Sequence, residues 1–162
     1  MFDVPRTLYA SEGDLRIAYQ VVGQRPLDLV FAPGGQIPVD LIWEEPGCSR
    51  FLQRLSSFSR MVLFDSRGWG ASRTTTETAP TFEAWADDLR LVMDTVGIER
   101  AAVVGFLAGA VFSIYFAATH PERVSSLVLL EGFARMLRDA DYPAGITPAA
   151  LDNGTRAYVE GY

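Results

Sequence analysis

Four short apolar runs, none of them alternating with polar residues, restrict the fold of this chain more than any other feature. Such runs are typical of strands buried on both faces of a parallel sheet, since a strand with one wet face alternates. They comprise residues 27–31, 61–64, 101–105 and 127–130. Helical patterns fill the gaps between them. This order predicts an α/β fold with right-handed crossovers.

An antiparallel hairpin is expected ahead of the first of these strands. Residues 7–10 and 15–22 are β-prone, and residues 11–14, Ser-Glu-Gly-Asp, have the chemistry of a turn. Three amphipathic helices should follow. Phe51, Leu55 and Phe58 are spaced as the apolar face of the first helix, and Thr81 is the N-cap candidate of the second. The third, residues 108–119, is apolar around most of its circumference and is expected to be the most buried.

Charge and cysteine usage exclude several classes of function. The net charge is −6 and all 14 basic residues are arginine, which argues against binding to nucleic acid. Cys48 is the only cysteine, and no segment near the N-terminus resembles a signal peptide, so we expect a cytoplasmic protein. Gly105 and Gly109 divide the longest weakly polar stretch, and no membrane span is predicted.

Functional residues are expected directly after each buried run, because ligands of open parallel sheets bind at the carboxyl ends of the strands. Four loops qualify. They read Ala-Pro-Gly-Gly at residues 32–35, Asp-Ser-Arg-Gly-Trp-Gly-Ala-Ser at 65–72, Phe-Leu-Ala-Gly at 106–109 and Glu-Gly at 131–132.

Two of these loops carry the signature of a known family. The D-x-R-G-x-G-x-S pattern at 65–72, the G-x-x-x-G turn at 105–109 and the His-Pro-Glu-Arg-Val segment at 120–124 resemble the α/β-hydrolase superfamily. The resemblance implies a truncated α/β-hydrolase fold of about six strands in the order 1-2-4-3-5-6, with helices on both faces. Residues 1–132 would form the N-terminal part of the core, and residues 133–162 the start of a cap or a tail that folds back.

A narrower resemblance rests on three further stretches. Residues 17–23, residues 51–64, and residues 133–137 followed by Asp-Tyr-Pro at 141–143 look like the hydrolase-like domain fused ahead of class III adenylate cyclases in actinobacteria. This resemblance implies a sensory module, with a cyclase domain downstream in relatives.

Leu107 occupies the position at which the superfamily carries its nucleophile. In that family the turn reads G-x-Ser-x-G, and its glycines allow a strained residue to project into the site. Gly105 and Gly109 are retained here, but a leucine side chain has no lone pair with which to attack a carbonyl. Taken alone, G-x-x-x-G more often marks helix packing, and only the other loops favour an elbow with positive φ at Leu107.

The other parts of a hydrolase site are incomplete. Gly35 and Ala108 could supply the two oxyanion N–H groups, although Pro33 replaces the usual histidine and a plain turn is the simpler interpretation. His120, the single histidine, falls at the end of the third helix, where it would cap the helix terminus. Glu131 follows the last strand, where some members keep their acid, but a solvated or salt-bridged carboxylate is the simpler interpretation. No catalytic residue is therefore assigned.

Three other patterns have structural interpretations. Asp87 and Asp88 point about 100° apart on a helix, so they form a polar face and not a carboxylate dyad. Residues 68–70, Gly-Trp-Gly, lack the third glycine of a dinucleotide loop. Arg67 is expected to secure its loop by pairing with Asp65 or with backbone carbonyls. No cofactor or metal site is predicted.

The sequence supports two hypotheses about function. The first is a catalytically silent hydrolase-like module that senses a small apolar or ester-like ligand or binds a partner. The alternative is a fragment of an active esterase-like hydrolase, with its acid and histidine downstream and its nucleophile recruited from elsewhere. Because residues 127–130 are apolar and uncharged, the edge of the last strand should also mediate self-association.

Overall fold

A computed structural model of the chain describes residues 3–35, 37–74 and 79–160. It forms two compact units, residues 1–132 and residues 133–162. The first unit contains the whole sheet and the candidate site.

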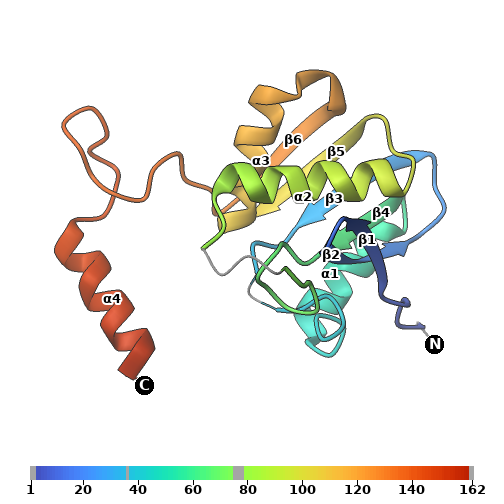
Figure 1. Cartoon of the computed structure of the whole chain (residues 1–162), viewed down its shortest axis with the longest axis horizontal. Coiled ribbons are helices and arrows are strands. Elements are labelled where there is room, and N and C mark those ends of the chain that lie inside the picture. The colour runs from blue at the N-terminus through green and yellow to red at the C-terminus, as the bar shows by residue number, and fades with distance from the viewer. Residues whose placement is uncertain (1–2, 36, 75–78, 161–162) are drawn as a thin grey trace. The chain divides into compact units, whose positions relative to one another are not determined.

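The first unit is built on a six-stranded sheet with the order β1-β2-β4-β3-β5-β6, as the family resemblance predicts (Figure 1). β1 and β2 form the antiparallel hairpin, and β2 also pairs antiparallel with β4. The remaining pairs are parallel. The strands are β1 (Leu8–Glu12), β2 (Leu15–Val22), β3 (Leu27–Ala32), β4 (Ser59–Phe64), β5 (Ala101–Phe106) and β6 (Val124–Leu130).

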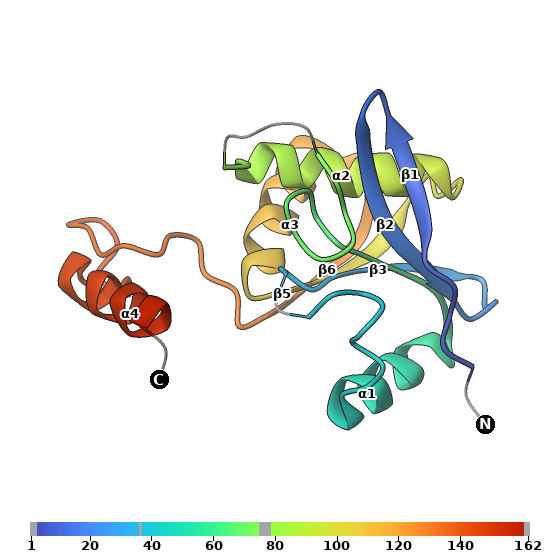
Figure 2. The ribbon, with the colours of Figure 1, turned by 60° about the horizontal axis from the view of Figure 1, so that its bottom comes forward.

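Helices cover the two faces of this sheet unequally. α2 (Phe82–Thr95) and α3 (Ala108–Thr119) pack on one face, and α1 (Pro46–Ser56) lies on the other, as Figure 2 shows. Adjacent residues of β3 alternate between the two cores: Val30 belongs to the core under α2 and α3, and Leu29 and Phe31 to the core under α1. The central strands are thus buried on both faces, which explains why their sequences do not alternate.

The buried side of α1 differs from the predicted one. Glu45 caps the helix through the N–H groups of Gly47 and Cys48, and the helix ends at Ser56, so Phe58 lies beyond it. Leu52 and Ser56 are the buried residues of α1. The predicted stripe is therefore wrong at Phe51 and Phe58, which are 42% and 45% exposed.

The prediction that α3 is the most buried helix is also wrong. α3 buries five of its 12 residues and α2 buries six of 14, so the two are buried to the same degree. Tyr115 of α3 is 38% exposed. The reason is the position of α3 over the last two strands, where its outer side has no neighbour within the described part of the first unit. α2 is capped by the Thr81 side chain as predicted.

The second unit is small and contains one helix, α4 (Pro148–Glu160). Ahead of it, Leu137 pairs with Ile146 and Asp139 with Tyr142 in two isolated bridges. The guanidinium of Arg135 lies 5.3 Å from the centre of the Tyr142 ring. Among the helices that the structure describes, none has the length and apolar character needed to cross a membrane.

Candidate functional site

The turn between β5 and α3 has the backbone geometry of an elbow. Leu107 sits there with φ 51° and ψ −117°, so the predicted positive φ is confirmed. Its N–H donates to the carbonyl of Leu130 at 3.0 Å, and its carbonyl accepts from the N–H of Ala110 at 3.0 Å. Holding a non-glycine residue at positive φ costs about 1–3 kcal/mol of conformational free energy, which the surrounding packing must offset.

Glycines make this turn sterically possible. A β-carbon at Gly109 would overlap the carbonyl oxygen of Ala32, and one at Gly105 would lie 2.6 Å from the Cα of Ala110. A β-carbon at Gly34 would in turn lie 2.5 Å from the backbone nitrogen of Gly109. The ends of β3 and β5 and the start of α3 are thus in backbone contact. This close approach explains the G-x-x-x-G spacing better than helix packing does.

His120 lies far from the elbow, at the C-cap of α3. With 12 residues at about 1.5 Å each, the helix separates it from Leu107 by roughly 18 Å. Its ring stacks on Phe116 with 4.9 Å between centroids, and its Nδ1 lies 2.9 Å from the hydroxyl of Thr119. The histidine is therefore part of the helix end, and cannot act as a base at the elbow.

Glu131 and the candidate oxyanion donors Gly35 and Ala108 each adjoin in the chain a residue that belongs to or contacts the elbow. Glu131 directly follows β6, is exposed and has φ 53°. Trp69 covers Gly35, because a β-carbon there would lie 2.7 Å from Cδ2 of the indole. Ala108 is the first residue of α3. Anion binding by the N–H groups of Gly35 and Ala108 stays a prediction.

The D-x-R-G-x-G-x-S loop is held together by its first and last residues. The buried carboxylate of Asp65 accepts from the N–H groups of Val39 at 3.1 Å and Ala71 at 2.9 Å. The hydroxyl of Ser72 donates to the carbonyl of Asp65 at 2.6 Å and accepts from the N–H of Ala18 at 2.8 Å. The motif thus joins the middle of β2 and the end of β4 to the loop that follows β3.

Burial changes the titration of Asp65. It raises the pKa to about 6, although the N–H groups of Ala71 and Val39 act in the opposite direction. The negative charge of Asp40 adds to the increase. A β-carbon at Gly70, where φ is 53°, would overlap the Asp65 carboxylate, so the second glycine of the motif is also needed.

Arg67 pairs with Asp88 of α2, not with Asp65, and this corrects two predictions. Nη2 of Arg67 lies 2.7 Å from Asp88 Oδ1, and the Arg67 N–H donates to Oδ2 at 2.7 Å. Asp88 is fully buried, and burial raises its pKa against the effect of Arg67. Of the two aspartates, only Asp87 faces solvent. The two neighbouring aspartates thus have opposite environments, because α2 turns about 100° per residue.

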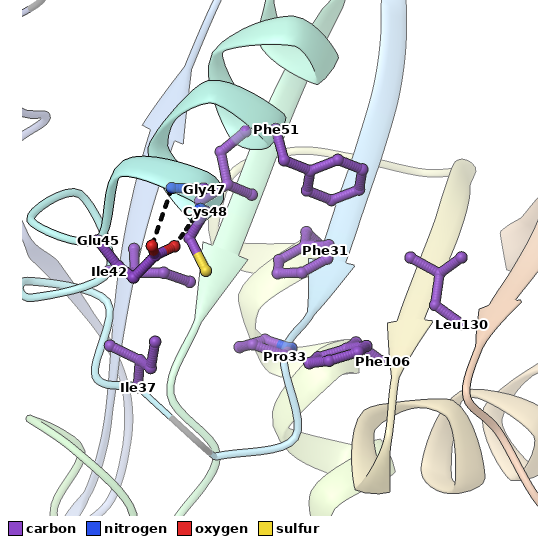
Figure 3. A pocket seen from close by; sticks show the side chains of 11 residues that line it. Phe31, Pro33, Ile37, Ile42, Glu45, Gly47, Cys48, Phe51, Phe106 and Leu130 are labelled. Carbon is purple, nitrogen blue, oxygen red and sulfur yellow. Dashed lines mark hydrogen bonds between the residues drawn. The ribbon is translucent and has the colours of Figure 1, made fainter.

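A cavity of about 350 Å³ opens on the α1 side of the sheet (Figure 3). Its walls are almost entirely apolar. Phe31 of β3 and Phe51 of α1 meet edge to face at 6.0 Å in its wall. The cavity is lined by Phe31, Pro33, Ile37, Ile42, Glu45, Gly47, Cys48, Phe51, Leu52, Phe106 and Leu130. Sequence patterns could not reveal it, because its lining comes from four elements and the loop between β3 and α1.

The carboxylate at the cavity wall is turned to its own helix. The Glu45 carboxylate accepts from the N–H groups of Gly47 and Cys48, which lowers its pKa (Figure 3). The thiol of Cys48 points into the cavity (Figure 3), and burial followed by the nearby Glu45 raises its pKa. The described residues contain no group of three His, Cys, Asp or Glu side chains able to hold a metal ion.

Comparison with known proteins decides the family. The α/β hydrolase fold family matches residues 45–159, which is more than half of the chain. The chain belongs to this family. The elbow, the strand order and the D-x-R-G-x-G-x-S loop are the features of the α/β-hydrolase core that it retains.

Relatives of this α/β-hydrolase-family chain include enzymes of several kinds. A Caulobacter sp. (strain K31) protein named as a carbamate hydrolase RutD is 42% identical over 84 residues, 52% of this chain and 31% of the relative. A 2-hydroxy-6-oxononadienedioate/2-hydroxy-6-oxononatrienedioate hydrolase of Paraburkholderia phymatum is 34% identical over 126 residues, 74% of this chain and 41% of the relative.

A solved structure shows the same fold over nearly the whole chain. A bromoperoxidase from Bacillus anthracis has a TM-score of 0.79 at 18% identity, and the match covers 95% of this chain and 55% of that protein. The chain thus spans about a third to a half of the length of these relatives.

Proposed function

We propose that this chain is a catalytically silent α/β-hydrolase module that binds a small apolar ligand. The observation that carries the proposal is Leu107 at the elbow. The backbone there has the strained geometry that serves a nucleophile, yet the side chain offers no atom that can attack. The single histidine lies at the far end of α3.

The cavity beside α1 supports the binding part of this proposal. Its volume of about 350 Å³ is at the lower end of the range for small-molecule sites. The wall is apolar and aromatic, and the nearest carboxylate, Glu45, is engaged by its own helix. A neutral aromatic or short acyl group suits such a wall better than a charged ligand, since nothing there would offset the desolvation of a charge.

An activity assay tests catalytic silence, and a binding assay tests the cavity. The chain should show no turnover of short p-nitrophenyl esters, and Leu107→Ser should not restore it, since a serine without a base gains little nucleophilicity. Turnover that disappears when one serine is mutated would contradict catalytic silence.

Binding is tested with the neutral fluorophore N-phenyl-1-naphthylamine. We expect saturable binding that Cys48→Phe weakens by at least about tenfold, because the larger side chain fills the cavity. Phe58→Ala is the control, since Phe58 is equally apolar but lies beyond α1 and away from the cavity. An equal loss of affinity in both variants would refute the assignment of this cavity as the binding site.

We further propose that the module is related to the cytoplasmic hydrolase-like domains that precede class III adenylate cyclases. Support comes from the stretches at residues 17–23, 51–64 and 133–143. The coding sequence that follows Tyr162 provides the test. A cyclase signature there supports a sensory role, and its absence contradicts it.

A second candidate is a fragment of an active esterase-like hydrolase. The lengths of the relatives favour it, because this chain covers only 31% and 41% of two hydrolases that it matches. Two more strands ending in an acid and a histidine, encoded downstream, would support it. Leu107 still argues against it, since the nucleophile would have to come from another residue.

A further inference from the structure

One part of the cavity wall depends on a single hydrogen bond to a distant part of the chain. This wall segment, residues 37–42, lies between β3 and α1, and Ile37 and Ile42 at its two ends line the cavity (Figure 3). The N–H groups of Leu41 and Ile42 donate to the carbonyl of Pro38 within the segment. Among the described residues, the only hydrogen bond that joins the segment to a part of the chain outside its own loop runs from the Val39 N–H to Asp65.

The carboxylate that receives this bond is buried and has no cation beside it. Asp65 is 1% exposed, and its two oxygens accept from the N–H groups of Val39 and Ala71. Within the described part of the chain it forms no ion pair, since the nearby Arg67 is engaged by Asp88. A charge in such surroundings is costly unless water or an opposite charge reaches it.

The charge closest to Asp65 on the wall segment increases this cost. Burial raises the pKa of Asp65 to about 6, and the negative charge of Asp40, which is next to Val39, adds to the increase. The other charged or titratable residues of the segments that contact Asp65 are turned elsewhere. Arg16, Glu44 and Arg73 are exposed, Glu45 caps α1, and Tyr19 packs in the core under α2 and α3.

We propose that ionisation of Asp65 opens the wall segment, so that pH sets how often the cavity opens on this side. Opening allows water to reach the charged carboxylate and separates it from Asp40. It also exposes the buried side chains of Val39 and Ile42, which keeps the open state a minority.

The second loop that contacts Asp65 is held by further bonds and stays in place. The hydroxyl of Ser72 bonds both to the carbonyl of Asp65 and to the N–H of Ala18. Arg73 and Arg16 exchange two backbone hydrogen bonds. These bonds do not involve the Asp65 carboxylate, so its ionisation leaves them intact. The wall segment, which has no such bonds, is therefore the part that moves.

Rising pH favours the open state. The pKa of Asp65 is about 6 in the closed state, and hydration in the open state returns it toward the ordinary value of 3.8. The closed state thus holds a proton that the open state releases, so the equilibrium constant for opening rises between these two values and is constant above about 6. A difference of about two pH units limits the rise to about 100-fold.

Hydrogen exchange of the full chain, followed by NMR from about pH 4 to about pH 7.5, tests the inference. After correction for the intrinsic exchange rate, the opening constant of the Val39 amide should rise with pH by up to about 100-fold. The Val103 amide of the central strand β5 should open less often, and low urea should accelerate its exchange but not that of Val39. A Val39 amide that opens only together with Val103, or whose opening constant does not rise with pH, would overturn the inference.

Three variants separate the contributions of the carboxylates. Asp65→Asn should abolish the rise with pH, since asparagine does not titrate. Asp40→Asn keeps both hydrogen bonds of Asp65 and should reduce the rise, because the repulsion between the two charges is lost. Glu44→Gln is the matched control in the same loop and should not change it, since Glu44 is exposed. A rise that persists in Asp65→Asn, or that Glu44→Gln reduces as much as Asp40→Asn does, would contradict the inference.

The connection between this wall and the ligand rests on the proposed function and has a separate measurement. N-phenyl-1-naphthylamine at about ten times its Kd should lower the opening constant of Val39 about tenfold, because a ligand that contacts Ile37 and Ile42 binds only the closed wall. Bound fluorophore that leaves this constant unchanged would refute the connection. If the fluorophore does not bind, the proposed function fails, and the pH dependence of Val39 exchange still decides whether Asp65 opens the wall.

Discussion

The buried carboxyl of Asp65 should make the chain less stable as the pH rises through the weakly acidic range. Its pKa is about 6 in the folded chain, compared with an ordinary value of 3.8. Between these values the folded state holds a proton that the unfolded state has released, so stability falls with pH there and is constant above about 6. A shift of about two units at roughly 1.4 kcal/mol each corresponds to a loss of about 3 kcal/mol.

Urea unfolding of the wild type and of Asp65→Asn, from about pH 4 to about pH 8, measures this contribution. Asparagine does not titrate, and its amide leaves one of the N–H groups of Val39 and Ala71 without an acceptor. That loss costs about 1–3 kcal/mol at every pH. The free energy of unfolding of the wild type minus that of the variant should therefore fall by about 3 kcal/mol with rising pH. Burial also raises the pKa of Asp88, but Asp88 is present in both proteins, so its contribution to the difference in free energy of unfolding cancels.

The control is Asp40→Asn. Asp40 is exposed, and its negative charge contributes to the raised pKa of Asp65. Removing that charge should move the midpoint of the stability curve to lower pH without abolishing the slope. A difference between wild type and Asp65→Asn that does not depend on pH would refute the role of burial. A difference that increases with pH would show that the two N–H groups outweigh desolvation.

Two more predictions concern packing. Gly109→Ala should destabilise the fold by at least about 2 kcal/mol, because its β-carbon would overlap Ala32. The control is Gly154→Ala, in open space on α4, which should stabilise the fold by about 0.5–1 kcal/mol. Equal midpoints of thermal unfolding for the two variants would contradict the elbow packing. Arg67→Leu should cost about 3–5 kcal/mol in urea unfolding, because it removes the guanidinium from the buried Asp88 carboxylate and leaves it only the backbone N–H of residue 67, and adding Asp88→Leu should recover most of the loss. A double variant as unstable as the single one would show that the ion pair itself stabilises the loop.

The strands could be predicted from the sequence because their causes are local. The run at residues 101–105 lacks polar alternation and is buried on both faces as predicted, but residues 127–130 show the same pattern and the prediction of burial is wrong there, since Val128 and Leu129 are 45% and 41% exposed. Gly105 and Gly109 permit the sharp turn at Leu107 by their lack of side chains, but their spacing alone more often marks helix packing, and the positive φ was expected only because the other loops resemble the family. The strand order came from the family resemblance and not from the pattern, since periodicity does not say which strands are neighbours.

Side-chain environments were predicted less well, because they depend on which elements meet. Asp87 and Asp88 are the same residue type on the same helix, and only the loop after β4 decides that Asp88 is buried against Arg67. Phe51 and Phe58 have helical spacing, yet α1 ends before Phe58 and turns Leu52 to the sheet. Neither outcome could be predicted from residue type and helical spacing alone.

Local sequence thus determined the strands and placed at position 107 a leucine, which has no nucleophilic atom, because backbone sterics and side-chain chemistry act within a few residues. Only the tertiary structure decided the raised pKa of Asp65, the pairing of Arg67 with Asp88 and the cavity beside α1. Each of these brings together segments from different crossovers, and their distances depend on how the sheet orders its strands.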